Sequence, residues 1–218
     1  MCDDQTELDV DEFERKGGQL NRREFGKLSA AVGIAAMLPQ VVNAAEVTES
    51  DVQITTPDGV ADCYFVHPST GKHPAVLIWP DILGLRPAFR SMGKRLAESG
   101  YSVLVVNPFY RSAKSPVISE GSSFRQSETR EIVLPMYRIL SPETNVIDAK
   151  SFIAWLDGQE VVDTTKKIGT NGYCMGGPMV MRTAAVSPER IGAIASFHGG
   201  GLATEADDSP HLLIPSRR

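Results

Sequence analysis

The stretch AVLIWPDILGLRPAFRSMGKRLAESGYSVLVV, residues 75–106, determines the fold class of this 218-residue sequence. It contains two apolar runs, Ala75–Trp79 and Ser102–Val106, which predict strands, and residues 86–99 between them have helical spacing. Strand, helix and strand in this order predict a βαβ unit with parallel strands. Because neither run alternates with polar residues, we expect both strands to be buried on both faces. The predicted fold class is therefore α/β, a mostly parallel sheet with helices on both faces.

The flanking sequence extends this pattern in both directions. Towards the N-terminus, β-rich runs at 51–55 and 61–66 surround the turn signal Pro57-Asp58-Gly59 and predict a hairpin. Towards the C-terminus, the pattern predicts a polar excursion with some helix at 111–144, a helix at 146–156, a strand at 167–173, a helix at 175–186, a strand at 191–197 and the start of a further strand at 211–214.

The segment GYCMGG, residues 172–177, lies between a predicted strand and a predicted helix. It matches the G-x-nucleophile-x-G pattern, with Cys174 in the nucleophile position. Glycines on either side let the chain pass a sharp turn without a Cβ clash. The helix that follows directs its N–H groups and positive dipole end at the sulfur, which favours the reactive thiolate. The alternative is a glycine-rich turn with a buried, inert cysteine; the strand–turn–helix context favours the catalytic interpretation.

Composition narrows the function classes. A formal net charge of -5 argues against nucleic-acid binding, which needs a concentrated basic surface. The three cysteines, Cys2, Cys63 and Cys174, include no C-x-x-C pair and indicate neither a disulfide framework nor a zinc site. A disulfide between Cys63 and Cys174 stays open. No metal site is predicted.

The N-terminal region has the order of features found in secretory signals. Arg22 and Arg23 precede an apolar run at 28–38, and small residues follow at 42–44. The run is too short to span a bilayer, which takes about 20 residues, and the paired arginines resemble a twin-arginine signal. The alternative is an amphipathic or buried N-terminal helix.

Two consequences follow for the organisation of the chain. Residues 1–45 are predicted to be a leader with a twin-arginine-type signal, and residues 46–218 the folded domain. The leader predicts a transient encounter with the twin-arginine export machinery and a periplasmic or secreted location.

Four segments together resemble the dienelactone hydrolase family of the α/β-hydrolase superfamily. They are VLIWPDILGL at 76–85, VVNPFYR at 105–111, GYCMGG at 172–177 and ASFHGG at 195–200, and the resemblance covers about residues 50–215. It implies an α/β-hydrolase fold and the hydrolysis of cyclic enol-lactones and related esters by a Cys-Asp-His triad. It also implies a small-molecule lactone or ester substrate and no cofactor.

The same resemblance suggests roles for individual residues. Cys174 matches the nucleophile, and Asp81 matches an acidic position, usually glutamate, that interacts with the resting thiol. The backbone N–H groups of Ile82 and Met175 match the donors of the oxyanion hole. Arg125 or Arg130 is a candidate for holding a substrate carboxylate, with a solvated surface charge as the alternative.

The histidine and acid of the triad have no matched position. His198 corresponds to a structural or pocket-lining residue, with a substitute base as the alternative, and the family acid and histidine would follow the predicted strand that begins at His211. We therefore expect the last strand and helix of the fold to be missing, with an exposed sheet edge and lower stability.

Three functions remain open from the sequence. The first is hydrolysis of a small lactone or ester through an acyl-enzyme at Cys174. The second is an inactive, truncated family member or small-molecule-binding remnant. A flavodoxin-like binding domain is the third, and it is disfavoured because the loop at 80–84 has a single glycine and an acidic residue where phosphate would bind. Oligomeric state is not predicted.

Overall fold

The computed structural model describes residues 44–214. The predicted signal, with its arginines at 22 and 23 and its apolar run at 28–38, lies outside the described residues. Within residues 44–214, no helix is both long and apolar enough to cross a bilayer.

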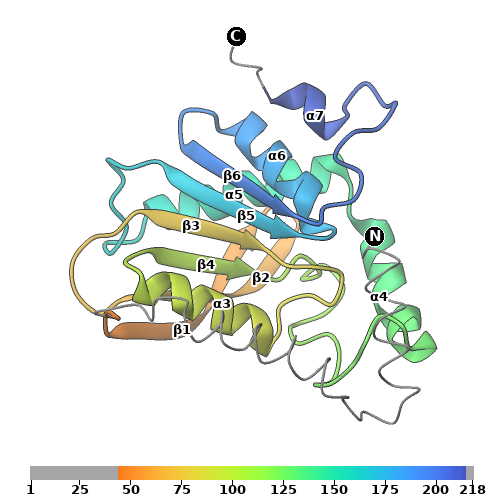
Figure 1. The fold of residues 1–218 in the computed structure, drawn as a ribbon, viewed down its shortest axis with the longest axis horizontal. Helices are drawn as coiled ribbons and strands as arrows, with labels where there is room; N and C mark the ends of the chain where they lie inside the picture. The colour runs from red at the N-terminus through yellow and green to blue at the C-terminus, as the bar shows by residue number, and fades with distance from the viewer. Residues whose placement is uncertain (1–43, 215–218) are drawn as a thin grey trace, which may run out of the picture. The chain divides into compact units, whose positions relative to one another are not determined.

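A six-stranded sheet forms the centre of the described domain, in the order β1-β2-β4-β3-β5-β6 (Figure 1). The strands are β1 (Val47–Thr56), β2 (Gly59–Pro68), β3 (Ala75–Trp79), β4 (Ser102–Val106), β5 (Ile168–Tyr173) and β6 (Ile191–Phe197). β1 is antiparallel to β2, and β2 to β4, whereas β4, β3, β5 and β6 run parallel. The predicted hairpin and the predicted mostly parallel sheet are both confirmed.

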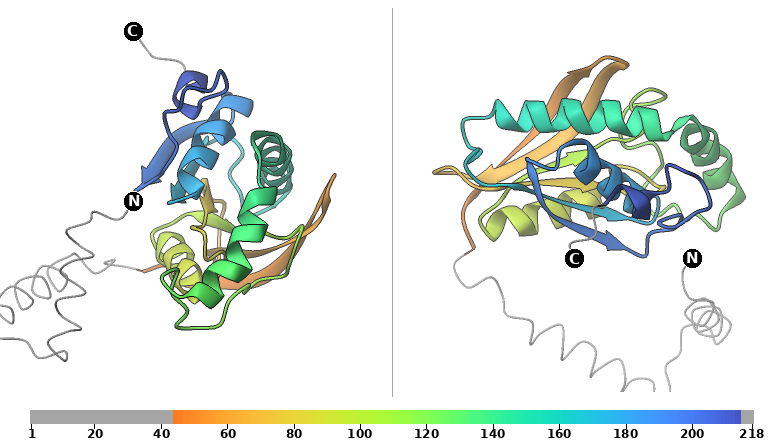
Figure 2. Two further views of the ribbon diagram at one scale, coloured as in Figure 1. Left: turned by 90° about the vertical axis from the view of Figure 1, so that its right-hand side faces the viewer. Right: turned by 90° about the horizontal axis from the view of Figure 1, so that it is seen from above.

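Helices cover both faces of this sheet, as predicted (Figure 2). They are α3 (Pro87–Glu98), α4 (Ser127–Ile139), α5 (Pro142–Asp157), α6 (Gly176–Val186) and α7 (Pro210–Leu213). α3 packs on one face, and α5 and α6 pack on the other. α5 begins at a capping box, in which Ser141 and Thr144 each accept the other's backbone N–H.

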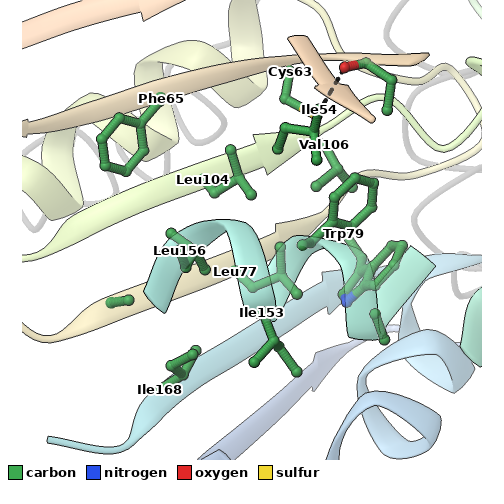
Figure 3. Packing of buried hydrophobic residues seen from close by; sticks show 14 of the residues in the cluster. Ile54, Cys63, Phe65, Leu77, Trp79, Leu104, Val106, Ile153, Leu156 and Ile168 are labelled. Carbon is green, nitrogen blue, oxygen red and sulfur yellow. Dashed lines mark hydrogen bonds between the residues drawn. The ribbon is translucent and has the colours of Figure 1, made fainter. Parts of the chain in front are cut away.

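Two apolar clusters, one on each face, hold the layers together. Leu77 and Trp79 of β3 belong to the cluster under α5 and α6 (Figure 3). Ile78 belongs to the cluster under α3. The Trp79 ring packs against Phe152 of α5 with centroids 5.8 Å apart. Burying one such large apolar side chain contributes about 1.5–3 kcal/mol. Burial on both faces explains why the β3 sequence has no polar alternation.

The prediction of a strand at 211–214 is wrong, because Pro210–Leu213 forms the short helix α7. Pro210 occupies the first turn, where its fixed φ suits a helix and its missing N–H costs nothing. The Leu212 N–H donates to the Ser209 carbonyl oxygen at 2.9 Å, and Ser209 Oγ pairs with His211 Nδ1 at 2.8 Å. β6 is therefore the edge strand of the described sheet, and Ile194 and Phe197 on it are 36% and 46% exposed.

Candidate active site

Cys174 lies on the tight turn between β5 and α6, with a positive φ of 52°. The left-handed backbone costs a non-glycine residue about 1–2 kcal/mol, so the surrounding structure must hold it there. The Cys174 N–H donates to the Phe197 carbonyl oxygen at 3.1 Å, and the Gly177 N–H donates to the Cys174 carbonyl oxygen at 3.0 Å. A strained strand-to-helix turn has the form expected around a nucleophile, and the role of Cys174 as that nucleophile stays a prediction.

The two cysteines of the described domain differ in environment. Both are free thiols, so the disulfide left open by the sequence is not formed. Cys63 is buried, and that burial raises the pKa of its thiol. Cys174 is partly exposed, and within residues 44–214 no group hydrogen-bonds to its sulfur. Of the two, Cys174 is therefore the thiol that a reagent or substrate can reach.

Glycines are required around this turn because backbone segments touch there. A Cβ atom at Gly172 would lie 2.2 Å from the Gly176 carbonyl oxygen, and one at Gly176 would lie 2.4 Å from the Trp79 carbonyl oxygen. The parallel register pairs Trp79 with Gly172. The start of α6 therefore abuts the end of β3, and the residues that follow Trp79 lie beside the Cys174 turn.

The two predicted oxyanion donors lie on these adjoining segments. Met175 is the N-cap residue of α6, and Ile82 follows β3 by three positions. In the part of the chain that the structure describes, neither backbone N–H has a hydrogen-bond acceptor. Unpaired donors that converge on one point stabilise a carbonyl oxygen as it gains negative charge, and this role for Ile82 and Met175 stays a prediction.

The Asp81 carboxylate binds Arg86. Arg86 Nη1 donates to Asp81 Oδ1 at 2.6 Å, and Nη2 donates to Oδ2 at 2.8 Å. The Leu83 N–H also donates to Oδ1, at 2.9 Å. Both carboxylate oxygens are thus engaged, and the sequence had given no sign of Arg86 because the pairing depends on the path of the loop. The contact predicted between Asp81 and the Cys174 thiol stays a prediction.

The remaining predicted site residues lie in two places. Arg130 donates to the carbonyl oxygens of Phe124, at 3.1 Å, and of Arg125, so it holds the turn before α4. The side chain of Arg125 is exposed. His198 directly follows β6, has a positive φ of 42° and meets the Tyr173 ring at 6.5 Å. It therefore lies at the same sheet edge as Cys174, whereas a role for either arginine in binding substrate stays a prediction.

An ion-pair network that sequence analysis missed fixes the segment after β4. Arg111 donates to both carboxylate oxygens of Asp148, at 2.7 and 2.9 Å, and to Asp58 at 2.7 Å. The Tyr110 hydroxyl donates to Asp148 at 2.7 Å. Burial raises the pKa of Asp148, although the hydrogen bond from Arg111 opposes that shift. The position of Asp148 on the core side of α5 could have indicated a buried ion pair. Its partners could not be identified from the sequence, because they are over 30 positions away.

One hollow of about 330 Å³ lies beside the Asp81 loop, and its lining includes Arg86, Pro116 and Ile118. Among the residues that the structure describes, no cluster of three or more His, Cys, Asp or Glu side chains could hold a metal ion.

Comparisons with known proteins match this architecture. The model of the family described as "Dienelactone hydrolase family" matches residues 61–215. A carboxymethylenebutenolidase from Rhodococcus opacus is 26% identical over 131 residues, which are 59% of this chain and 46% of that protein. A relative from Methylorubrum extorquens is 25% identical over 186 residues, which are 82% of this chain and 61% of the relative. The chain thus spans about half to three fifths of the length of these relatives.

A solved structure shows the same fold at lower sequence identity. The crystal structure of a protein from Klebsiella pneumoniae subsp. pneumoniae aligns with a TM-score of 0.61 at 17% identity. The alignment covers 76% of this chain and 65% of that one. The α/β-hydrolase-type arrangement of sheet and helices is therefore shared.

Proposed function

Because the chain belongs to the dienelactone hydrolase family, we propose that it hydrolyses small lactones or esters through an acyl-enzyme on Cys174. The observation that carries this proposal is the turn itself. A partly exposed cysteine is held at a φ of 52° between β5 and α6, beside backbone N–H groups that have no acceptor in residues 44–214. A strained backbone conformation of this kind is characteristic of functional positions.

The proposed reaction uses this thiol and the neighbouring N–H groups. The Cys174 thiolate attacks the carbonyl carbon, and the N–H groups of Ile82 and Met175 hold the negative oxygen that forms. The bond from the carbonyl carbon to the alkoxide oxygen then breaks, and the alkoxide takes up a proton. In a lactone this opens the ring. Water cleaves the resulting thioester, which releases the carboxylic acid and returns the thiol.

The test is covalent labelling by 4-nitrophenyl acetate, read by intact-protein mass spectrometry. We expect the wild-type chain to gain one acetyl group and Cys174→Ala to gain none. Cys63→Ala is the matched control because the Cys63 thiol is buried, and it should be acylated like the wild type. Labelling that persists in Cys174→Ala, or a folded wild type that is never acylated, would contradict the proposal and favour an inactive or ligand-binding family member.

We also propose that the chain is exported through the twin-arginine machinery to the periplasm. Its support is the order of paired arginines, apolar run and small residues at 22–44. In a bacterial host, the full chain should appear in the periplasmic fraction, and replacing Arg22 and Arg23 by lysine should retain it in the cytoplasm. Equal export of both forms would refute the twin-arginine route.

A further inference from the structure

Five hydrogen bonds close the loop between β3 and α3 on itself. The Arg86 guanidinium binds both oxygens of the Asp81 carboxylate, at 2.6 and 2.8 Å, and also donates to the Gly84 carbonyl oxygen at 3.2 Å. The Leu83 N–H donates to the Asp81 carboxylate and the Gly84 N–H to the Asp81 carbonyl oxygen, each at 2.9 Å. The two charged side chains are 22% and 21% exposed, so the ion pair is partly shielded from water.

The arginine itself is anchored towards the Cys174 turn. Its guanidinium lies over the Phe89 ring, 4.9 Å from the centroid. Phe89 meets the Tyr173 ring edge-on at 5.3 Å, and Tyr173 directly precedes Cys174. The loop after β3 and the turn after β5 are therefore linked through side chains as well as through the close backbone contact at Gly176.

Ile82 lies inside this closed loop and takes no part in its bonds. Its neighbours Asp81 and Leu83 are both fixed by the hydrogen bonds described above, and its own N–H has no acceptor among residues 44–214. The peptide that carries the donor is thus held rigidly while the donor stays free. A donor of this kind stabilises an oxyanion only if it is already in place when the charge develops.

We propose that Arg86 is a positioning residue that, through Asp81, fixes the Ile82 N–H as an oxyanion donor. This inference rests on the proposed hydrolase function. It gives the Asp81 carboxylate a structural role, as the acceptor that closes the loop, in place of a direct contact with the thiol. Bidentate pairing explains why residue 86 is an arginine, because a lysine ammonium group cannot bind both carboxylate oxygens in the same way.

The variants Arg86→Met, Arg86→Lys and Asp81→Ala, with the double variant Asp81→Ala/Arg86→Met, test this role. Arg90→Met is the matched control, since Arg90 lies on α3 in the turn directly after the N-cap residue Arg86, pairs with Asp51 at 2.5 Å and stacks on the Tyr64 ring at 4.7 Å. With 4-nitrophenyl acetate, we expect kcat to fall about tenfold or more in Arg86→Met with KM little changed, because removing an oxyanion donor outright costs about 10²–10³ in kcat. Arg86→Lys should recover part of the loss, and Arg90→Met should match the wild type.

Alkylation of Cys174 by iodoacetamide separates positioning from a general structural role. This reaction displaces iodide at a saturated carbon and forms no oxyanion, so its rate and pH profile should be unchanged in all of these variants. The double variant should be no slower in ester hydrolysis than either single variant, because the two side chains act as one unit. Full kcat in Arg86→Met, additive losses, or a shifted alkylation profile in Asp81→Ala would overturn the proposal.

Amide hydrogen exchange tests the closed loop independently of ester hydrolysis. Arg86→Met should speed exchange of the Leu83 and Gly84 amides, which Arg90→Met should leave protected. If the wild-type protein is folded and alkylated but never hydrolyses the ester, the proposed function fails. If exchange at Leu83 and Gly84 is the same with and without Arg86, the closed loop is refuted, whatever the activity.

Discussion

Replacing Gly172 by alanine should destabilise the domain, whereas the same change at Gly169 in the same strand should not. A Cβ atom at Gly172 would lie 2.2 Å from the Gly176 carbonyl oxygen and 3.0 Å from Val180 Cγ1. A Cβ atom at Gly169 would meet only Val76 Cγ2, at 3.7 Å, which is an ordinary van der Waals contact. The two variants therefore differ in the space around one methyl group.

The loss of stability in Gly172→Ala depends on which atoms must move to make room for the methyl group. The obstructing atoms at Gly172 belong to the backbone of α6, and α6 cannot rotate freely because Gly176 itself abuts the Trp79 carbonyl. Overpacking of a filled site lowers the free energy of unfolding by about 1–3 kcal/mol. Because the clash at Gly172 is with backbone, we expect Gly172→Ala to lower it by about 3 kcal/mol. At about 2–4 °C per kcal/mol for a domain of this size, the melting temperature should fall by about 6–12 °C. Gly169→Ala should stay within about 0.5 kcal/mol, because alanine also reduces the freedom of the unfolded chain.

Urea unfolding, followed by circular dichroism and by the fluorescence of the two tryptophans, measures the difference. The midpoint should fall in Gly172→Ala with the slope unchanged, which identifies a loss of stability in the native state. The rate of Cys174 alkylation should also change in Gly172→Ala, because the Cys174 turn moves with α6. Equal midpoints for the two variants would refute the claim that the turn requires glycine for reasons of space.

Three further outcomes are expected. Burial raises the pKa of Asp62, but hydrogen bonds, led by the one from Ser115, outweigh burial and lower the pKa overall. The stability that this lowered pKa gives is present above the unfolded-state pKa and is lost as the pH falls through the folded-state pKa. Ser115→Ala should therefore move acid unfolding, followed by circular dichroism, to higher pH. Arg111→Met should lower the free energy of unfolding in urea by about 3–5 kcal/mol, because it leaves the buried Asp148 charge unpaired. Adding Asp148→Asn should restore part of this stability, and no restoration would argue against a stabilising ion pair between Arg111 and Asp148. His198→Asn keeps a residue that tolerates positive φ and should leave acyl labelling within about twofold, whereas abolished labelling would identify His198 as the proton acceptor.

The parts of the fold that the sequence predicted are those with a local signal. β3 and β4 are buried on both faces, so their apolar runs are unbroken. The Cys174 turn was recognisable because its close backbone contacts admit only glycine at Gly172 and Gly176. In each case the physical requirement acts on neighbouring residues and leaves a pattern that can be read directly.

The parts that it did not predict depend on contacts between segments or on too few residues. Three apolar residues after His211 are too few to distinguish a strand from a helix. Pro210 at the first turn favours the helix α7. Arg86 and Asp81 pair only because the loop turns back on itself, and Arg111 reaches Asp148 across 37 positions.

Within residues 44–214, β6 is an edge strand of the sheet, and this should affect how the described domain behaves at high concentration. Ile191–Phe197 contains no charged residue and no proline, and its one irregularity lies at Gly192, which the pairing with β5 skips. Ala193–Phe197 keeps a regular register, so another extended chain could align beside it. Its exposed Ile194 and Phe197 side chains would add apolar contact to any such alignment. Association through this strand should therefore grow steeply with protein concentration, and a lysine in place of Ala195 should suppress it without disturbing the interior.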